Sequence, residues 1–346
     1  MHIPFCDSKC HYCAFNSYVD KFELKEAYMQ ALRRQLVHDL EHLVPEGTCI
    51  DTLFIGGGTP STVPPAYYAP IFEALANRLA PDAEITSEAN PNSATQEWLE
   101  GMRRLGVNRI SFGVQSFFDD KLKFLGRAHK ASEAIAAVER ARKVGFDRLS
   151  LDVIYATALD TNERIEEEVC TALSLPIEHL SAYELTIEEN TPFAERPEVW
   201  RESIDQARTI ATLCENAGLD RYEVSNFGRP CRHNLGYWRY EPYLGIGAGA
   251  VGRVGTRRLY PHRPLERYIE SPLHKEVEGL DTRSMVEERI FLGLRSVVGI
   301  DPSILDEEMK KRADLLVTEK KLLRKGGRYH NLDYLIADEI ALFILD

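Results

Sequence analysis

Short apolar runs alternate with long amphipathic stretches along the first two thirds of the chain. The short runs lie beside Gly, Pro, Asn or Asp and favour strands, whereas the long stretches repeat apolar residues every three or four positions and favour helices. The predicted strands are His2–Phe5, Asp51–Ile55, Glu84–Glu88, Asn108–Gly113, Arg148–Ile154 and His179–Leu185. The predicted helices are Phe22–Leu43, Pro65–Leu79, Gln96–Leu105, Ser132–Val144, Asn162–Leu173 and Pro197–Ala217. This alternation predicts an α/β fold in which right-handed β/α units form a parallel barrel or part of one.

Beyond these units the pattern weakens and then restarts. Segment 221–261 is rich in Gly, Tyr and Arg with little periodicity, which predicts irregular structure packed on the barrel. A helical pattern returns at 284–297, and 302–346 mixes short amphipathic helices with Gly326–Gly327. We therefore predict a core at 1–220, an irregular segment at 221–283 and a small, mainly helical, winged-helix-like C-terminal domain at 284–346.

The composition restricts the partners and the compartment. A net charge of −12 argues against a general affinity for nucleic acid or anionic membranes. The sequence contains neither an apolar run long enough for a transmembrane segment nor a secretory signal, so we expect a cytoplasmic protein. Seven irregularly spaced cysteines do not resemble a disulfide scaffold, and a reducing compartment would keep them as thiols or metal ligands.

Three of these cysteines crowd into eight residues. Cys6, Cys10 and Cys13 directly follow the first predicted strand, at a spacing that lets one loop wrap three corners of an iron–sulfur cube. A nearby fourth thiol is missing, because Phe15 stands where a tighter motif would carry one, and the fourth iron would therefore be exchangeable. A zinc site is the alternative, but its closing ligands would have to come from His11 in the same loop.

Glycines and polar residues follow several predicted strands, at the ends where ligands bind in such barrels. The second strand runs into Gly56-Gly57-Gly58-Thr59-Pro60, and three glycines let a backbone approach a ligand closely. Taken singly, each polar residue near a strand end is more often a core or solvated residue than a ligand contact. Together they offer acids, an amide and a base to a zwitterion and a ribose diol. The candidate ligand-binding residues are Gly57, Gly58, Thr59, Glu88, Gln115, Arg127 and Asp152.

The spacing CX3CX2C, with Tyr12 before the third cysteine, resembles the radical S-adenosylmethionine (SAM) superfamily. The resemblance implies a 4Fe–4S cluster on Cys6, Cys10 and Cys13, whose open iron chelates the amino and carboxylate groups of SAM. It also implies a partial, TIM-like (β/α)6 barrel. Such a cluster, once reduced by an electron donor, can release a deoxyadenosyl radical from the cofactor.

Nearly the whole chain, including Tyr183-Glu-Leu-Thr186 and the C-terminal domain, resembles oxygen-independent coproporphyrinogen oxidases and their haem-chaperone relatives. In that family the seven candidate ligand-binding residues fall on cofactor-contacting positions. The oxidase branch carries a further Cys where this chain has Phe15. The chaperone branch carries a His-Asn-x-x-Tyr-Trp motif, which is present here as His233, Asn234, Tyr237 and Trp238.

Two functions remain open. The first is a haem chaperone, in which His233 ligates haem iron, Tyr237 and Trp238 cover the macrocycle, and an acceptor protein receives the haem. From the residues alone, a histidine at this position is more often a hydrogen-bonded residue packed among aromatic side chains than a haem ligand. The family resemblance makes the haem ligand the favoured interpretation. The second is a radical enzyme that decarboxylates coproporphyrinogen propionates, so the architecture leaves open whether the chain is an enzyme. Dimer formation is also open.

Two departures from the family pattern stand out. The residues that usually open the first strand, including a Tyr, are absent before His2, which leaves open whether the true start lies upstream of Met1. Residues Ala156 to Ala158 replace the usual Gly-Leu-Pro after the fifth strand, which leaves the role of that loop open.

Overall fold

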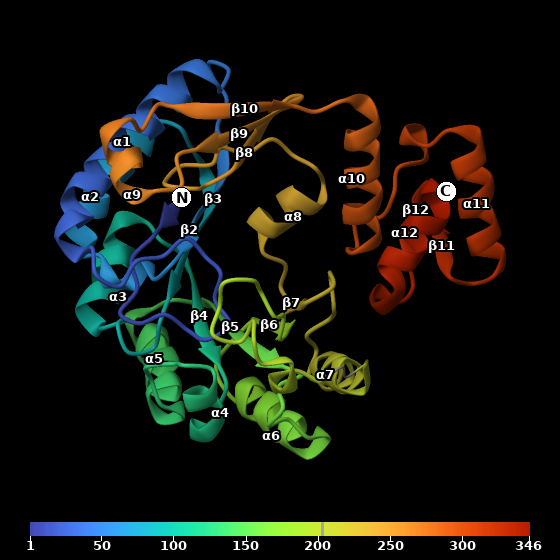
Figure 1. Ribbon diagram of the computed structural model, residues 1–346, viewed down its shortest axis with the longest axis horizontal. Coiled ribbons are helices and arrows are strands. Elements are labelled where there is room, and N and C mark those ends of the chain that lie inside the picture. The colour runs from blue at the N-terminus through green and yellow to red at the C-terminus, as the bar shows by residue number, and fades with distance from the viewer. Residues whose placement is uncertain (202–203) are drawn as a thin grey trace.

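The computed structural model describes residues 1–201 and 204–346 as an open barrel with a C-terminal extension (Figure 1). Its sheet runs in the order β1-β2-β3-β4-β5-β6-β7, with β1 to β6 parallel and β7 antiparallel to β6. The strands are β1 His2–Ile3, β2 Ile50–Gly57, β3 Leu79–Ala89, β4 Arg109–Gln115, β5 Arg148–Tyr155, β6 His179–Glu184 and β7 Asn226–Gly228. Because β1 and β7 are the edges of the described sheet, the partial (β/α)6 barrel is confirmed.

Helices surround the strands as an outer layer (Figure 1). They are α1 Lys25–His42, α2 Pro65–Leu75, α3 Gln96–Leu105, α4 Asp119–Phe124, α5 Ala131–Val144, α6 Asn162–Leu173 and α7 Ile204–Asn216. Local sequence fixes several of their ends. The Thr95 side chain accepts a hydrogen bond from the Trp98 N–H at the start of α3, and Gly106 ends that helix in a left-handed conformation.

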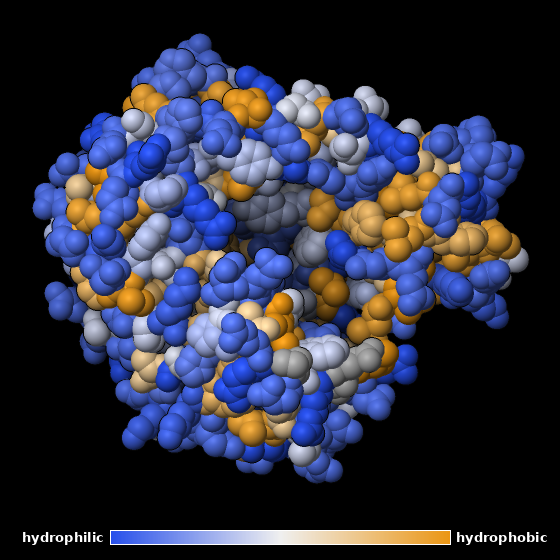
Figure 2. All heavy atoms as spheres, in the orientation of Figure 1, coloured by the Kyte–Doolittle hydropathy of each residue, from blue (hydrophilic) through white to orange (hydrophobic). Residues whose placement is uncertain are grey.

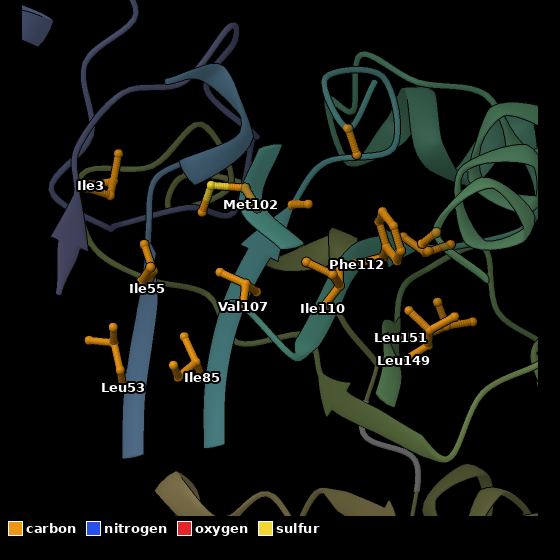
Figure 3. Packing of buried hydrophobic residues seen from close by; sticks show 14 of the residues in the cluster. Ile3, Leu53, Ile55, Ile85, Met102, Val107, Ile110, Phe112, Leu149 and Leu151 are labelled. Atoms are coloured by element: carbon orange, nitrogen blue, oxygen red, sulfur yellow. The ribbon is translucent and has the colours of Figure 1, made fainter. Parts of the chain in front are cut away.

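The strands carry apolar residues outward and polar residues inward. Leu53, Ile55 and Ile85 pack in the layer between the sheet and the helices (Figure 3). The alternate residues, such as Glu84 and Arg109, are also buried, and they line the barrel interior. The interior is therefore a column of polar groups, and the hydrophobic core lies outside the sheet.

Some boundaries differ from the predictions. Helix α2 ends at Leu75 because Leu79–Ala83 joins β3, and the short helix α4 was not predicted. The predicted helix Pro197–Ala217 divides into a 3-10 turn, Pro197–Val199, and α7, while its residues 202–203 lie outside the described residues. Further 3-10 turns are Phe22–Leu24, Pro60–Thr62, Pro302–Ile304 and Tyr334–Ile336.

The prediction of irregular structure over 221–261 is wrong in part. Besides β7, this segment forms α8 Arg232–Trp238, β8 Gly252–Val254 and β9 Arg257–Pro261. Strand β9 pairs with β8 and with β10 Lys275–Gly279, which follows α9 Leu265–Glu270, in an antiparallel sheet ordered β10-β9-β8. Strands of three to five residues are too short to show a clear hydrophobic period. The surface view is hollowed where Figure 1 shows α8 (Figure 2).

The C-terminal part holds a hydrophobic cluster of its own. Its elements are α10 Thr282–Leu294, α11 Glu307–Thr318, β11 Leu322–Lys325, β12 Arg328–Asn331 and α12 Ala337–Leu345. Leu294, Tyr329 and Ile340 are among the residues buried in this cluster. Among the helices described, none has the length and apolar character to cross a membrane.

Candidate functional site

A cavity of about 590 Å³ opens at the carboxyl ends of the barrel strands. It collects every residue proposed from the sequence for the cluster and for the cofactor. These lining residues are Cys6, Cys10, Cys13, Gly57, Gly58, Thr59, Glu88, Gln115, Arg127 and Asp152. Residues from four strands, the cysteine loop and the segment after α4 therefore meet in one place, as the parallel barrel requires.

The cysteine loop is tied to the barrel by its backbone. The Cys6 N–H donates to the Tyr18 carbonyl over 3.0 Å, and the His11 N–H donates to the Leu125 carbonyl over 3.0 Å. The His11 ring also shares a 2.8 Å hydrogen bond with the Phe124 carbonyl, so this side chain anchors the loop to the end of α4. Burial raises the pKa of the Cys6 thiol, and a bound iron would favour its thiolate form.

The glycines at the end of β2 are required by the protein's own packing. A Cβ on Gly58 would lie 2.9 Å from the Ile3 carbonyl oxygen and 3.0 Å from the Cys6 sulfur. Gly57 has a φ of 113°, and a Cβ there would lie 2.4 Å from the His2 ring. The glycines therefore seat the cysteine loop against β2, besides lining the cavity.

A hydrogen-bonded chain connects two of the thiols. Arg127 donates from Nη1 to the Cys10 sulfur over 3.2 Å and from Nη2 to Asn90 Oδ1 over 2.7 Å. Asn90 Nδ2 donates to Thr59 Oγ1 over 3.1 Å, and Thr59 Oγ1 donates to the Cys6 sulfur over 3.4 Å. Asn90 was missed by the sequence analysis, although it lies two residues after Glu88 in Ser-Glu-Ala-Asn-Pro.

Two carboxyl groups share the inner wall of the cavity. Glu88 Oε2 accepts a 3.0 Å hydrogen bond from the Gly57 N–H, and Asp152 accepts one from Ser111 Oγ over 3.3 Å. Burial, reinforced by the Asp152 charge, raises the pKa of Glu88 to about 7. Burial also raises the pKa of Asp152. A cationic amino group would relieve this unfavourable pairing.

Gln115 ends β4 in a left-handed conformation with a φ of 67°, and the β4–β5 register shifts between Gly113 and Gln115. A residue with a side chain costs free energy in this region, and such conformations concentrate at functional sites. The irregularity places Gln115 on the cavity wall.

The residue set fits a cluster and a zwitterionic cofactor. Three thiols border the cavity, and Arg127 Nε is buried without a hydrogen-bond partner in the described residues. An acceptor on a bound ligand would satisfy this orphaned donor. Cys6, Cys10 and Cys13 would hold the cluster, which supplies an open iron and an electron when bound. Glu88, Asp152 and Arg127 would then bind the charged groups of SAM.

A Glu88→Gln variant is expected to be more stable than wild type at pH 8, by about 1–3 kcal/mol. Folding raises the pKa of Glu88 from 4.5 to about 7, so wild-type stability falls as the pH rises through that window. Glutamine mimics the protonated acid and removes this loss. Urea unfolding of the protein without ligands, at pH 5 and pH 8, measures the difference. An equal destabilisation at both pH values would contradict the expectation, and the exposed Glu41→Gln serves as control.

The His-Asn-x-x-Tyr-Trp motif forms α8, and its histidine is fully engaged. His233 Nδ1 shares a 2.7 Å hydrogen bond with Thr52 Oγ1, and Nε2 shares one of 3.0 Å with the Tyr237 hydroxyl. The ring stacks on Phe54 with centroids 5.3 Å apart. Burial lowers the pKa of His233 to about 4, so the imidazole is neutral at physiological pH. Asn234 and Trp238 lie on the same helix and are half-buried.

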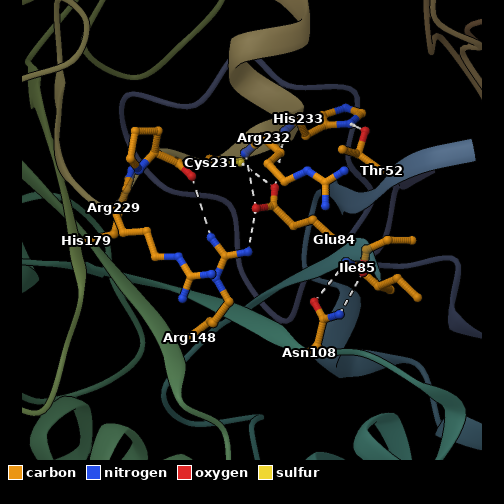
Figure 4. Close-up of polar contacts among 12 residues, drawn as sticks. Thr52, Glu84, Ile85, Asn108, Arg148, His179, Arg229, Cys231, Arg232 and His233 are labelled. Carbon is orange, nitrogen blue, oxygen red and sulfur yellow. Dashed lines mark hydrogen bonds and ion pairs between the residues drawn. The ribbon is translucent and has the colours of Figure 1, made fainter. Parts of the chain in front are cut away.

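A buried carboxylate holds the start of α8 (Figure 4). Glu84 accepts 3.1 Å hydrogen bonds from the backbone N–H groups of Arg232 and His233, and it forms a 2.7 Å ion pair with Arg148. The buried Cys231 thiol donates to Glu84 over 3.2 Å, so it faces the barrel and packs as a structural group.

The two sites occupy opposite ends of the barrel interior. Thr52 precedes Gly57 by five residues on β2, and Glu84 precedes Glu88 by four on β3. A strand rises about 3.3 Å per residue, so the α8 contacts lie about 13–16 Å along the strands from the cavity. The structure thus assembles the cysteine and cofactor residues in one site and the α8 motif in another.

An open (β/α)6 barrel with a CX3CX2C loop over its carboxyl end defines a radical SAM protein, and residues 1–169 match the model of the Radical SAM superfamily. The chain belongs to the HemW family. It is 33% identical to the "Heme chaperone HemW" of Bacillus subtilis, over 96% of this chain and 92% of that one. It is 38% identical to the HemW of Escherichia coli, over 81% and 78% of the two chains.

A solved structure of similar fold is the coproporphyrinogen III oxidase HemN of Escherichia coli. The TM-score is 0.81, with 21% sequence identity over 99% of this chain and 88% of the other. At this identity the likeness shows the fold alone.

Proposed function

We propose that this protein is a haem chaperone, which binds haem through α8 and transfers it to an acceptor protein. The observation that carries the proposal is His233, a neutral imidazole held on an aromatic helix in a chain of the HemW family. Neutral imidazole is the form that ligates haem iron. The proposal includes a 4Fe–4S cluster on the three cysteines and SAM in the adjoining cavity.

Haem coordination at His233 requires a local change, because both ring nitrogens are engaged. The Thr52 side of the ring faces β2, whereas the Tyr237 side chain is 40% exposed on α8. The proposed ligand atom is therefore Nε2, which Tyr237 releases when its hydroxyl turns away. Tyr237 and Trp238 would then lie against the macrocycle.

The sequence at the cavity mouth supports the chaperone over the oxidase. Phe15 follows Cys13 by two residues, lines the cavity and is 65% exposed. The oxidase branch has a further thiol at this position, and an apolar ring cannot replace its chemistry. Formation of protoporphyrinogen at a sustained rate by the reconstituted protein, under anaerobic reducing conditions, would overturn the chaperone proposal.

In this proposal three parts of the chain have different roles. The core at 1–220 holds the cluster, segment 221–283 carries the haem-binding helix, and 284–346 forms a winged-helix-like domain with its own hydrophobic cluster. An acceptor protein takes the haem, and an electron donor serves the cluster if it is reduced. A reducing cytoplasm would keep all seven cysteines free of disulfides.

A His233→Ala variant is expected to weaken haem binding at least tenfold and to change the Soret band. The wild type should bind haemin one to one, because it offers one neutral ligand above an aromatic surface. Anaerobic haemin titration of the reconstituted full chain, followed by the Soret absorption, measures both effects.

A Tyr237→Phe variant sharpens this experiment. It removes the hydroxyl that occupies His233 Nε2 and keeps the aromatic ring, so haem should bind at least as tightly as in wild type. The exposed His42 supplies a control, since His42→Ala should leave the titration unchanged. Wild-type behaviour of His233→Ala would exclude this ligand, and a wild type without saturable binding would overturn the chaperone proposal.

A further inference from the structure

We propose that Asn90 is a positioning residue that directs hydrogen bonds onto two of the three cluster thiolates and thereby raises the reduction potential of the cluster. The inference rests on the proposed cluster at Cys6, Cys10 and Cys13, and goes beyond it by assigning a role to a residue that makes no hydrogen bond to a cysteine in the described structure and acts through Arg127 and Thr59.

The geometry requires a side chain that both donates and accepts. Asn90 Oδ1 accepts from Arg127 Nη2 over 2.7 Å, while Asn90 Nδ2 donates to Thr59 Oγ1 over 3.1 Å. Because Thr59 Oγ1 receives the amide proton, its own proton is left to point at the Cys6 sulfur, 3.4 Å away. A primary amide performs both tasks, because it carries an acceptor oxygen and donor N–H groups on separate atoms.

Further hydrogen bonds hold Asn90 and Arg127 in place. The Asn90 N–H donates to Ser61 Oγ over 3.0 Å, and the Asn90 carbonyl accepts from the Ala94 N–H over 3.0 Å. The second anchor of Arg127 Nη2 is the Gly113 carbonyl, 2.6 Å away. The guanidinium plane is therefore fixed with Nη1 aimed at the Cys10 sulfur.

Hydrogen bonds to cluster sulfurs stabilise the reduced form, because one-electron reduction adds negative charge that the donors offset. Arg127 contributes a charged donor, and the Thr59 hydroxyl contributes a neutral one. Loss of the Asn90 amide frees the Thr59 proton to rotate and removes one of two anchors from the guanidinium. Reduction then becomes less favourable, although all three thiol ligands remain.

The test compares Asn90→Ala with Asn92→Ala in the reconstituted full chain. Asn92 lies on the same loop and is exposed, and in the described structure its side chain donates a long, 3.5 Å hydrogen bond to Asp7. Dithionite titration without SAM, followed by electron paramagnetic resonance, gives the midpoint potential. We expect Asn90→Ala to lower the reduction equilibrium constant about tenfold, which is about 59 mV for one electron. Asn92→Ala should match wild type.

A second pair of variants tests the same inference if Asn90→Ala does not retain its cluster. Thr59→Val removes the donor to the Cys6 sulfur, and Thr59→Ser keeps it. The potential should fall in Thr59→Val and return in Thr59→Ser. If these hydrogen bonds only stabilised the fold, the variants would change the cluster content or the free energy of unfolding. The reduction potential of the cluster in loaded protein would then stay at the wild-type value.

The outcomes separate this inference from the proposed function. A wild type without stoichiometric iron and sulfide would remove the cluster itself. A loaded wild type, together with wild-type potentials in Asn90→Ala or in Thr59→Val, would overturn the positioning role alone. A change in SAM affinity with no change in potential would also overturn it, because Asn90 would then act on the cofactor.

Discussion

A Cys10→Ala variant is expected to lose its iron and sulfide while it stays folded. Cys10 belongs to a loop, is only half-buried, and contributes nothing to the hydrophobic core. Alanine keeps the Cys10 carbonyl that accepts a hydrogen bond from the Cys13 N–H. Two thiolates remain, which is too few to hold a 4Fe–4S cluster.

The test measures the iron and sulfide content of the variant and its free energy of unfolding. Iron and acid-labile sulfide should fall to background in Cys10→Ala, and the free energy of unfolding without ligands should fall by no more than about 1–2 kcal/mol, because Arg127 loses one hydrogen bond. The exposed Cys49 gives the matched control, because Cys49→Ala removes a thiol far from the loop in sequence and should retain the full cluster. A full cluster in Cys10→Ala would refute the assignment of the motif.

The barrel could be predicted from the sequence because its strands and helices have strong and different periods. Helices α3 and α6 also begin with threonine caps, so their first residues, Gln96 and Asn162, were predicted correctly. The candidate cofactor residues converge because each one stands near a parallel strand end, and the fold brings those ends together.

Other features depend on contacts that no local pattern encodes. The pairing of β8, β9 and β10 joins short strands whose partners are set by tertiary packing. The engagement of His233 with Thr52 spans 181 positions in the chain, and that of Arg127 with Asn90 spans 37. Such hydrogen bonds follow from the completed barrel, and the sequence gives no signal for them.

Ala156 adopts a backbone conformation that usually favours glycine. It occupies the place of the family's usual glycine after β5, and the backbone keeps a left-handed φ of 65°. The Ala156 N–H donates to Gln206 Oε1 over 3.1 Å, and the Ala156 carbonyl accepts from the Arg201 N–H over 3.0 Å. These contacts hold a conformation that alanine alone disfavours.

A Lys121→Met variant is expected to lose about 3–5 kcal/mol of stability. The Lys121 side chain is fully buried, and its ammonium lies 2.7 Å from Asp160 Oδ1 and 2.7 Å from Glu168 Oε2. Methionine fills similar space without the charge, so two carboxylates would be left buried and unpaired. Urea unfolding measures the loss, and Lys123→Met, two residues on and exposed, should stay within about 0.5 kcal/mol of wild type.

The same change should weaken SAM binding, because Lys121 ties together the segment between Gln115 and Arg127, which are two of the proposed SAM-binding residues. Helix α4 lies between Gln115 and Arg127, and Glu168 also accepts a 3.0 Å hydrogen bond from the Phe117 N–H just after β4. Neutralising the partners as well, in Lys121→Met with Asp160→Asn and Glu168→Gln, should recover much of the stability. Recovery of SAM affinity along with stability would show that the ion cluster acts through the position of this segment. A single variant as stable as wild type would mean that water reaches the carboxylates and that the segment is held by its apolar contacts.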